Sequence, residues 1–183
     1  MDETELTPKN IVLIGFMGSG KSTVGRELHR RLGYALADTD EMIEKSIGKK
    51  ITEIFKEEGE SAFRDFETLQ LIEISKNSDE RHIISTGGGI VVGPQNRSLL
   101  KNLGYVVWLD APEDVIFERT SRNRDRPLLN NQDAKTKISK LLAEREPWYR
   151  ETAHLKIDTA GLDSAEIATG ILESARYYFT SGV

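Results

Sequence analysis

The chain has no cysteine among its 183 residues. This absence excludes disulfide bonds, thiolate nucleophiles and zinc–thiolate centres, and it is compatible with a reducing compartment. No apolar run approaches the ~20 residues that a membrane-spanning helix needs. The first residues are acidic and not apolar, so we expect neither a secretory signal nor an arginine-rich transit peptide. We therefore expect a cytoplasmic protein.

The chain also lacks an excess of basic residues. Its formal net charge is −5 at pH 7, which argues against general binding to nucleic acids or membrane surfaces. The charged fraction of 30% and the hydrophobic fraction of 38% are those of an ordinary globular protein. We find no internal repeat, low-complexity tract or second domain, and the length suffices for a substantial core. Residues 1–183 are therefore predicted to form a single domain.

One glycine-rich motif is present between a predicted strand and a predicted helix. Residues 15–22 read Gly-Phe-Met-Gly-Ser-Gly-Lys-Ser, which matches the spacing G-x-x-x-x-G-K-[ST]. In such a loop the glycines let successive backbone N–H groups point into one concavity and hold phosphate oxygens. Lys21 is expected to reach the β- and γ-phosphates of a nucleotide, and the Ser22 hydroxyl to bind Mg²⁺. The N-terminus of the following helix adds its positive dipole to this anion site.

Five short apolar runs alternate with helical patterns. The runs cover residues 10–14, 34–37, 82–86, 105–109 and 154–158. Helices are predicted for residues 22–32, 41–47, 52–76, 96–102, 113–122, 134–149 and 163–178. This alternation predicts an α/β fold, a three-layer sandwich in which helices cover both faces of a five-stranded parallel sheet. In such sheets, ligands bind at the carboxyl ends of the strands.

Two carboxylates follow the second predicted strand. Asp38 and Asp40 are two residues apart, so they share one face while the strand continues. One could hold a water on Mg²⁺ while the other accepts a hydrogen bond from an attacking hydroxyl. The alternative is that Asp40 caps a helix beginning at Glu41 and that Asp38 is solvated. Their position beside a phosphate loop favours the chemical interpretation.

Arg64 and the triplet Gly87-Gly88-Gly89 each have two interpretations. Arg64 lies three residues before Glu67 on a predicted helix, and this pairing could fix its guanidinium for bidentate capture of a carboxylate. The alternative is a solvated surface ion pair. The glycine triplet could expose backbone N–H groups to a small polar ligand, or it could form a loose turn.

Residues 122–131 are too polar and too punctuated for a helix or strand, and they are long enough for a flap. Arg126 in this segment could fold over the γ-phosphate and supply positive charge to the transition state. Closure would also exclude water, which competes with the acceptor for the phosphoryl group. We expect the lid to cover about 120–133.

Taken together, these motifs resemble those of the shikimate kinases, small P-loop kinases of the nucleoside-monophosphate-kinase structural type. The resemblance runs from about residue 9 to residue 158. It rests on the phosphate loop with Thr23, Asp38-Thr39-Asp40, Phe63-Arg64-Asp65-Phe66-Glu67, Gly87-Gly88-Gly89, and Arg126-Pro127-Leu128-Leu129 followed by Arg145-Glu146-Pro147-Trp148-Tyr149. The first motif is shared by many nucleotide-binding proteins, whereas the whole set is specific.

The resemblance implies transfer of the ATP γ-phosphate to the 3-hydroxyl of shikimate, which gives shikimate 3-phosphate and ADP on the route to chorismate and the aromatic amino acids. It implies catalytic roles for Lys21, Asp40 and Arg126, and a Mg²⁺ site at Ser22 and Asp38. The nucleotide-binding residues that it implies are Gly18, Ser19, Gly20, Lys21, Ser22, Thr23, Arg119 and Arg126. The substrate-binding residues are Asp40, Arg64, Gly88 and Arg145, with a substrate-binding helical region over about 41–76. Residues 159–162 match the adenine-side loop of the family only weakly, and no role is assigned there.

Two other functions are compatible with a phosphate loop. One is a kinase of similar size that acts on gluconate or on a nucleoside monophosphate, and Asp40, Arg64 and Arg145 are the residues that would separate it from a shikimate kinase. The other is a non-catalytic ATP-binding module, against which the intact Lys21 and Ser22 argue. The expected partners are shikimate and ATP, with no nucleic acid and no membrane, and we expect a monomer.

Overall fold

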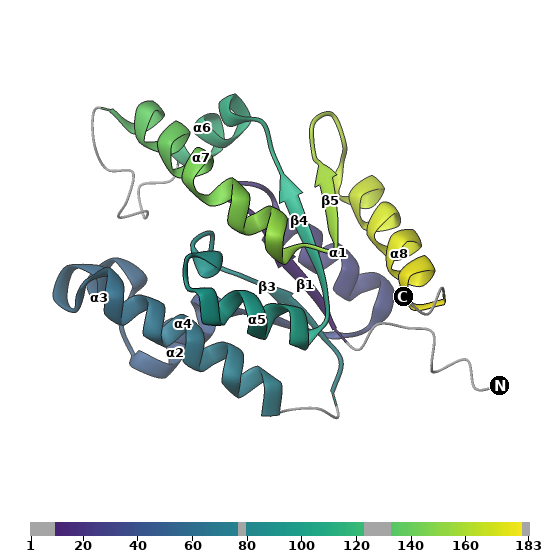
Figure 1. Ribbon diagram of the computed structural model, residues 1–183, viewed down its shortest axis with the longest axis horizontal. Coiled ribbons are helices and arrows are strands. Elements are labelled where there is room, and N and C mark those ends of the chain that lie inside the picture. Colours follow the sequence, from purple (N-terminus) through teal and green to yellow (C-terminus); the bar gives the residue numbers. More distant parts are fainter. Residues whose placement is uncertain (1–9, 77–79, 123–132, 181–183) are drawn as a thin grey trace.

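The computed structural model describes residues 10–76, 80–122 and 133–180. Its centre is a sheet of five parallel strands in the order β2-β3-β1-β4-β5 (Figure 1). The strands are β1 (Ile11–Ile14), β2 (Ala35–Asp38), β3 (His82–Ser85), β4 (Tyr105–Asp110) and β5 (Leu155–Asp158). All five predicted strands are confirmed, and each predicted end differs from the observed one by at most one residue.

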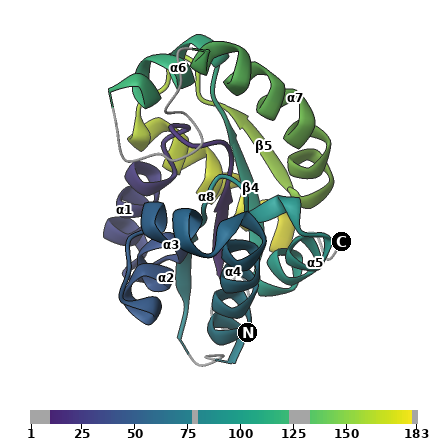
Figure 2. The same cartoon turned by 90° about the vertical axis from the view of Figure 1, so that its left-hand side faces the viewer.

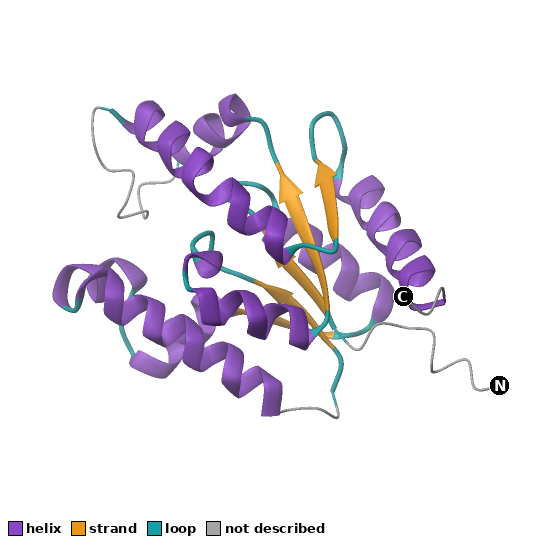
Figure 3. Ribbon diagram, viewed as in Figure 1, coloured by secondary structure: helices purple, strands orange, loops and turns teal. Residues whose placement is uncertain are grey.

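Helices cover both faces of the sheet (Figure 3). They are α1 (Lys21–Leu32), α2 (Thr39–Ile47), α3 (Ile51–Glu57), α4 (Gly59–Lys76), α5 (Pro94–Leu103), α6 (Glu113–Ser121), α7 (Ala134–Thr152) and α8 (Ser164–Thr180), with a 3₁₀ turn, η2 (Ile90–Val92). Helices α1 and α8 pack on one face, where Leu28 and Ile171 meet Leu13 of β1. Helices α4, α5 and α7 cover the other face, where Leu71 and Leu100 are packed in a second core. The predicted three-layer α/β sandwich is therefore confirmed.

The strand at the centre of the sheet is apolar along its whole length. All four residues of β1 are fully buried, because β3 and β4 pair with its two edges and helices cover both of its faces. A strand in this position has no solvent-facing side, and this explains its continuous apolar sequence rather than an alternating one.

One predicted helix is wrong. The pattern of residues 52–76 predicted a single helix, but the chain forms α3 and α4 with a break at Glu58. Gly59 follows with a φ of 84°, a conformation that residues with a side chain rarely adopt. The break lets α3 fold against α2 and α4 around Ile43, Ile54 and Phe63. Figure 2 shows these three helices side by side, and they occupy the predicted substrate-binding region.

The order of the strands creates a crevice at their carboxyl ends. From β1 the chain passes through α1 to β2, whereas from β3 it passes through α5 to β4 on the other side of β1. The loops after β1 and β3 therefore leave two neighbouring strands in opposite directions, and parallel sheets bind ligands at such a point. Among the helices of the described ranges, none is both long enough and apolar enough to cross a membrane.

Candidate active site

The loop between β1 and α1 forms a backbone concavity. Gly15, Gly18 and Gly20 have φ values of 144°, 81° and 101°, which only glycine adopts readily. Gly20 is the N-cap of α1, and no side chain caps this helix or places an acidic group in its first turn. The positive end of α1 therefore faces the loop without a neutralising side chain, which suits an anion.

Lys21 lies under this loop. Its Nζ donates hydrogen bonds to the carbonyl oxygens of Gly15 at 2.7 Å and Phe16 at 2.9 Å, and the residue is 7% exposed. A second cation, Arg119 of α6, donates to the carbonyl oxygen of Gly18 at 3.0 Å. Both cations are thus held by the loop's own carbonyl oxygens, so positive charge is in place before any phosphate binds.

A cavity of about 500 Å³ opens beside the loop. Every predicted nucleotide-binding residue that the structure describes lines it, namely Gly18, Ser19, Gly20, Lys21, Ser22, Thr23 and Arg119. Asp38 and Asp40 line the same cavity, as do Gly87 and Gly88. Lys21 and Asp40 therefore face one common space. Thr159 and Leu162 also reach it, which places the loop that the sequence left without assigned residues beside the nucleotide-binding residues.

Asp38, and not Asp40, caps helix α2. The Oδ1 atom of Asp38 accepts hydrogen bonds from the backbone N–H groups of Asp40 at 3.0 Å and Glu41 at 3.3 Å, and the helix begins at Thr39. The capping alternative was therefore right in kind, but it named the wrong carboxylate. Because both bonds use Oδ1, the cap does not require the second oxygen of Asp38, Oδ2.

Arg64 is paired with two carboxylates of its own helix. It donates to Glu67 at 2.7 Å and to Glu60 at 2.8 Å. The Glu67 side chain is fully buried and that of Arg64 is 15% exposed, so the solvated surface ion pair is a wrong interpretation. Burial raises the pKa of Glu67 to about 7, although the Arg64 guanidinium acts to lower it, and nearby Asp40 raises it further. Carboxylates of α2 and α4 thus lie within electrostatic reach of each other.

The turn Gly87-Gly88-Gly89 is tightly enclosed. A Cβ atom would lie 2.6 Å from Asp40 Oδ1 at Gly87, 2.8 Å from the backbone nitrogen of Met17 at Gly88, and against the Arg64 guanidinium at Gly89. The interpretation as a loose turn is therefore wrong. The missing side chains let α2, α4 and the phosphate loop approach this backbone directly.

Arg145 and Tyr149 reach the same turn from α7. They are four residues apart on the helix, and both donate to the carbonyl oxygen of Gly88, Arg145 at 3.2 Å and Tyr149 through its hydroxyl. The Arg145 guanidinium lies over the Phe16 ring, 5.5 Å from its centroid. Figure 1 shows the turn after β3 between α4 and α7, so each of these helices contributes one arginine to it. Neither Arg64 nor Arg145 lines the cavity itself, and both adjoin it through the glycine turn.

Sequence reasoning assigned no site role to three residues that hold this arrangement together. The Thr39 side chain is fully buried, and its Oγ1 accepts the Gly87 N–H at 3.1 Å. Glu67 was noted as a partner of Arg64 but not as a buried titratable group. Tyr149 was quoted only as part of a motif. The available indications were the position of Thr39 between two aspartates and the spacing of Tyr149 from Arg145, which puts both on one helix face.

Two predicted features, the lid and the Mg²⁺ site, differ in how far the structure describes them. Most of the predicted lid, including Arg126, lies outside them, so its place over the phosphates stays a prediction. Within the described ranges, no group of three or more His, Asp or Glu side chains could hold a metal ion by itself. Ser22 and Asp38 do line one cavity. A hydroxyl and a carboxylate near nucleotide phosphates fit Mg²⁺, which commonly takes one or two protein ligands and completes its shell with phosphate oxygens and water.

Both the sequence and the fold match known proteins. A sequence model of a family described as shikimate kinase matches residues 17–176. A shikimate kinase of Thermodesulfovibrio yellowstonii is 45% identical over 165 residues, which cover 90% of this chain and 94% of that protein. Among solved structures, a shikimate kinase from Acinetobacter baumannii in complex with shikimate has a TM-score of 0.89 at 40% identity, covering 95% of this chain and 96% of its own. A shikimate kinase from Aquifex aeolicus has a TM-score of 0.77 at 37% identity, covering 90% and 95%.

Proposed function

The chain belongs to the shikimate kinase family, and from that membership we propose how its residues share the work of phosphoryl transfer. The reaction moves the γ-phosphoryl group of ATP to the 3-hydroxyl of shikimate and gives shikimate 3-phosphate and ADP. The observation that carries the residue assignment is that Lys21 and Asp40 line the same cavity at the carboxyl ends of the strands.

The phosphates of ATP bind the loop of residues 15–22. Backbone N–H groups of the loop and of the first turn of α1 hold the phosphate oxygens, and Lys21 places its charge on the β- and γ-phosphates. The Ser22 hydroxyl and, through water, Asp38 would hold Mg²⁺, which would neutralise charge on the phosphates. Arg119, which already contacts Gly18, lies on the nucleotide side of the cavity. Arg126 adds positive charge from the lid.

Asp40 aligns the acceptor and takes its proton. The shikimate oxygen forms a bond to the γ-phosphorus, the bond from that phosphorus to the β–γ bridging oxygen breaks with its electron pair going to ADP, and the hydroxyl proton passes to the Asp40 carboxylate. Phosphoryl transfer needs the acceptor in line and the charge neutralised rather than a covalent intermediate. Asp40 lies next to Gly87 and lines the same cavity as the phosphate loop, and this supports the role.

The carboxylate of shikimate binds between Arg64 and Arg145. The two guanidinium groups come from α4 and α7 and adjoin the same glycine turn, and a guanidinium can hold a carboxylate through two parallel hydrogen bonds. Glu67 holds Arg64 from its buried side and thereby limits the directions in which the guanidinium can point. A ring acid with hydroxyls is therefore gripped at its acid group by arginines and at its hydroxyls by Asp40.

A coupled assay of ADP release tests the assignment. Shikimate, gluconate, AMP and CMP are offered in turn with ATP and Mg²⁺, and only shikimate is expected to support turnover. Turnover with a nucleotide or gluconate alone would favour the related kinases over this function. Binding of ATP without turnover of any acceptor would favour a non-catalytic module.

We also propose a cellular location and an oligomeric state for the enzyme. We place it in the cytoplasm as a monomer that binds shikimate and ATP with Mg²⁺, and that binds neither nucleic acid nor membranes. Light scattering on the purified chain should then give a mass near 20.6 kDa with and without both substrates. A mass of twice that value would contradict the monomer.

A further inference from the structure

The carbonyl oxygen of Gly88 is the point at which α7 meets the glycine turn. It accepts two hydrogen bonds, one from Arg145 at 3.2 Å and one from the Tyr149 hydroxyl, which is the shorter of the two. A carbonyl oxygen has two lone pairs, so these donors fill its capacity. One of these two hydrogen bonds would be enough to pair the carbonyl oxygen, so the other can be lost without leaving it unpaired.

Tyr149 is held rigidly in this position. It is 1% exposed, and its ring stacks on Trp108 with centroids 5.7 Å apart. Burial raises the pKa of the Tyr149 hydroxyl, so this group stays protonated and remains a donor near neutral pH. The Tyr149 hydroxyl is thus a constant donor to this carbonyl. The Arg145 guanidinium is also buried, at 2% exposure, but it carries further N–H groups that can bind another acceptor.

In the proposed reaction, the N–H groups of Arg145 must also bind the carboxylate of shikimate. Bidentate capture of a carboxylate uses two N–H groups of one guanidinium in a fixed direction. If the Gly88 carbonyl depended on Arg145 alone, each binding event would have to compete with that hydrogen bond, because this part-buried carbonyl oxygen would lose its partner when the guanidinium turned to the substrate.

We propose that Tyr149 is a positioning residue that keeps the Gly88 carbonyl hydrogen-bonded and thereby leaves Arg145 available for the carboxylate of the substrate. This inference rests on the proposed role of Arg145 and adds a residue to which that proposal gives no part. Tyr149 touches neither substrate in this scheme and acts through the glycine turn and Arg145.

The variant Tyr149→Phe removes the hydroxyl and keeps the stacked ring. We expect the KM for shikimate to rise roughly tenfold, the value of one hydrogen bond to a charged group, while kcat and the KM for ATP stay within about twofold. The methyl ester of shikimate has no carboxylate for Arg145. With this ester as substrate, we therefore expect the wild type and Tyr149→Phe to have the same kcat/KM. An equal loss for shikimate and its ester, or no loss for either, would overturn the proposal.

A double-mutant cycle separates this inference from the proposed function. In an Arg145→Ala background, Tyr149→Phe should have no further effect on the KM for shikimate, because its action passes through Arg145. If the wild-type enzyme does not phosphorylate shikimate, the proposed function fails. If it does, and Arg145→Ala raises the KM while Tyr149→Phe changes it equally in both backgrounds, only the present inference fails.

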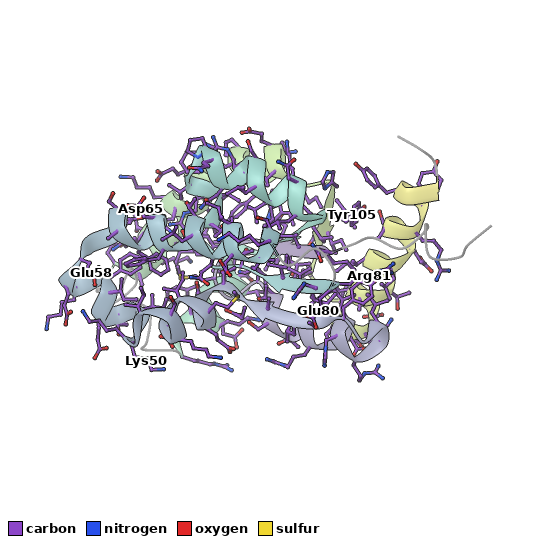
Figure 4. The ribbon with its side chains drawn as sticks, turned by 90° about the horizontal axis from the view of Figure 1, so that it is seen from below. Lys50, Glu58, Asp65, Glu80, Arg81 and Tyr105 are labelled. Atoms are coloured by element: carbon purple, nitrogen blue, oxygen red, sulfur yellow. The ribbon has the colours of Figure 1, made fainter. Side chains whose placement is uncertain are left out.

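Tyr105→Phe is the matched control. Tyr105 is 2% exposed, and its hydroxyl is hydrogen-bonded to Ser174 at 2.8 Å, so the variant removes a tyrosine hydroxyl of the same kind. It is the first residue of β4, at the end of the sheet opposite the site, and Figure 4 shows it far from Glu58 of the α3–α4 region. We expect unchanged KM values for both substrates, with thermal unfolding measured for both variants. A KM change in Tyr105→Phe as large as that in Tyr149→Phe would show a general effect of hydroxyl loss and overturn the proposal.

Discussion

Glu67 shows how far burial can change the chemistry of one residue. Its side chain is fully buried, and its pKa rises from the ordinary 4.5 to about 7. Between these two pH values the folded chain holds a proton on Glu67 that the unfolded chain has released. The contribution of this proton to stability is therefore complete below pH 4.5 and is lost as the pH rises through 7.

We expect Glu67→Gln to remove this pH dependence. A shift of this size corresponds to about 3 kcal/mol of unfolding free energy across the interval. Urea unfolding of the wild type at pH 5 and pH 8 should show a loss of that order, and the glutamine variant, which does not titrate, should lose much less. Glu60→Gln is the control, because Glu60 pairs with the same Arg64 but is 51% exposed. Equal pH dependence in the wild type and Glu67→Gln would contradict the assignment.

Asp40→Asn should separate chemistry from nucleotide binding. Asparagine keeps the size of the side chain but cannot take the hydroxyl proton, and general bases contribute about 10²- to 10⁴-fold to rates. We expect kcat to fall by at least about a hundredfold, with the dissociation constant of ATP nearly unchanged. Steady-state kinetics and calorimetric titration with a non-hydrolysable ATP analogue measure the two quantities. A variant with more than a tenth of the wild-type kcat would exclude Asp40 as the base.

Among the elements, the turn after β3 depends on its glycines for space and not for backbone conformation. None of Gly87, Gly88 and Gly89 has a positive φ, and Gly89 has a φ of −103° that alanine adopts freely. What a side chain would meet differs along the turn. At Gly89 it meets the movable guanidinium of Arg64, whereas at Gly88 it meets the backbone of the phosphate loop.

The two alanine variants should therefore have different kinetic effects. Gly89→Ala displaces Arg64 and should raise the KM for shikimate about tenfold with little change in the KM for ATP. Gly88→Ala pushes the loop at Met17 and should raise the KM for ATP as well. Gly170→Ala in α8, where the nearest atom is 4.0 Å away, is the control and should leave both values unchanged. If Gly89→Ala has the kinetics of the wild type, the carboxylate role of Arg64 is wrong.

The sequence predicted the presence of helices and strands better than it predicted helix ends, helix breaks and contacts between elements. The strands were evident because a buried parallel strand is apolar throughout, as β1 is. The break at Glu58 was missed although residues 56–61 interrupt the apolar pattern and include Gly59, because a polar stretch of this kind also occurs on the exposed face of a continuous helix. The capping alternative named Asp40 where Asp38 is the cap, since helix ends are set by side-chain hydrogen bonds that spacing does not reveal.

The residues that support the site were harder to find than those proposed to react. Lys21 and Ser22 belong to a local motif whose spacing carries its chemistry. Tyr149 and Gly88 are 61 residues apart in sequence, and Thr39 and Gly87 are 48 apart, so their contacts depend on the strand order. That order is a property of the folded sheet and is not written in any one segment.

The whole molecule brings the two proposed binding regions to one crevice from different strands. The phosphate loop follows β1, whereas the turn that Arg64 and Arg145 adjoin follows β3, which is paired with β1. Two substrates can therefore bind to separate side chains and still meet, because parallel neighbours end at the same edge of the sheet. This division predicts that each substrate stabilises the fold through its own residues.

Thermal unfolding in the presence of one ligand at a time tests whether the two substrates bind to separate residues. A ligand at a hundred times its dissociation constant adds about 2.7 kcal/mol to stability, or roughly 5–10 °C in Tm for a domain of this size. We expect Lys21→Ala to lose the shift caused by ADP and to keep the shift caused by shikimate, and Arg64→Ala to show the reverse. Arg30→Ala, which removes an exposed ion pair on α1, should keep both shifts. Each variant is compared with its own ligand-free Tm, so a change in intrinsic stability does not affect the result. If either variant lost both shifts, the two regions could not bind independently, and the substrates would have to share one set of residues.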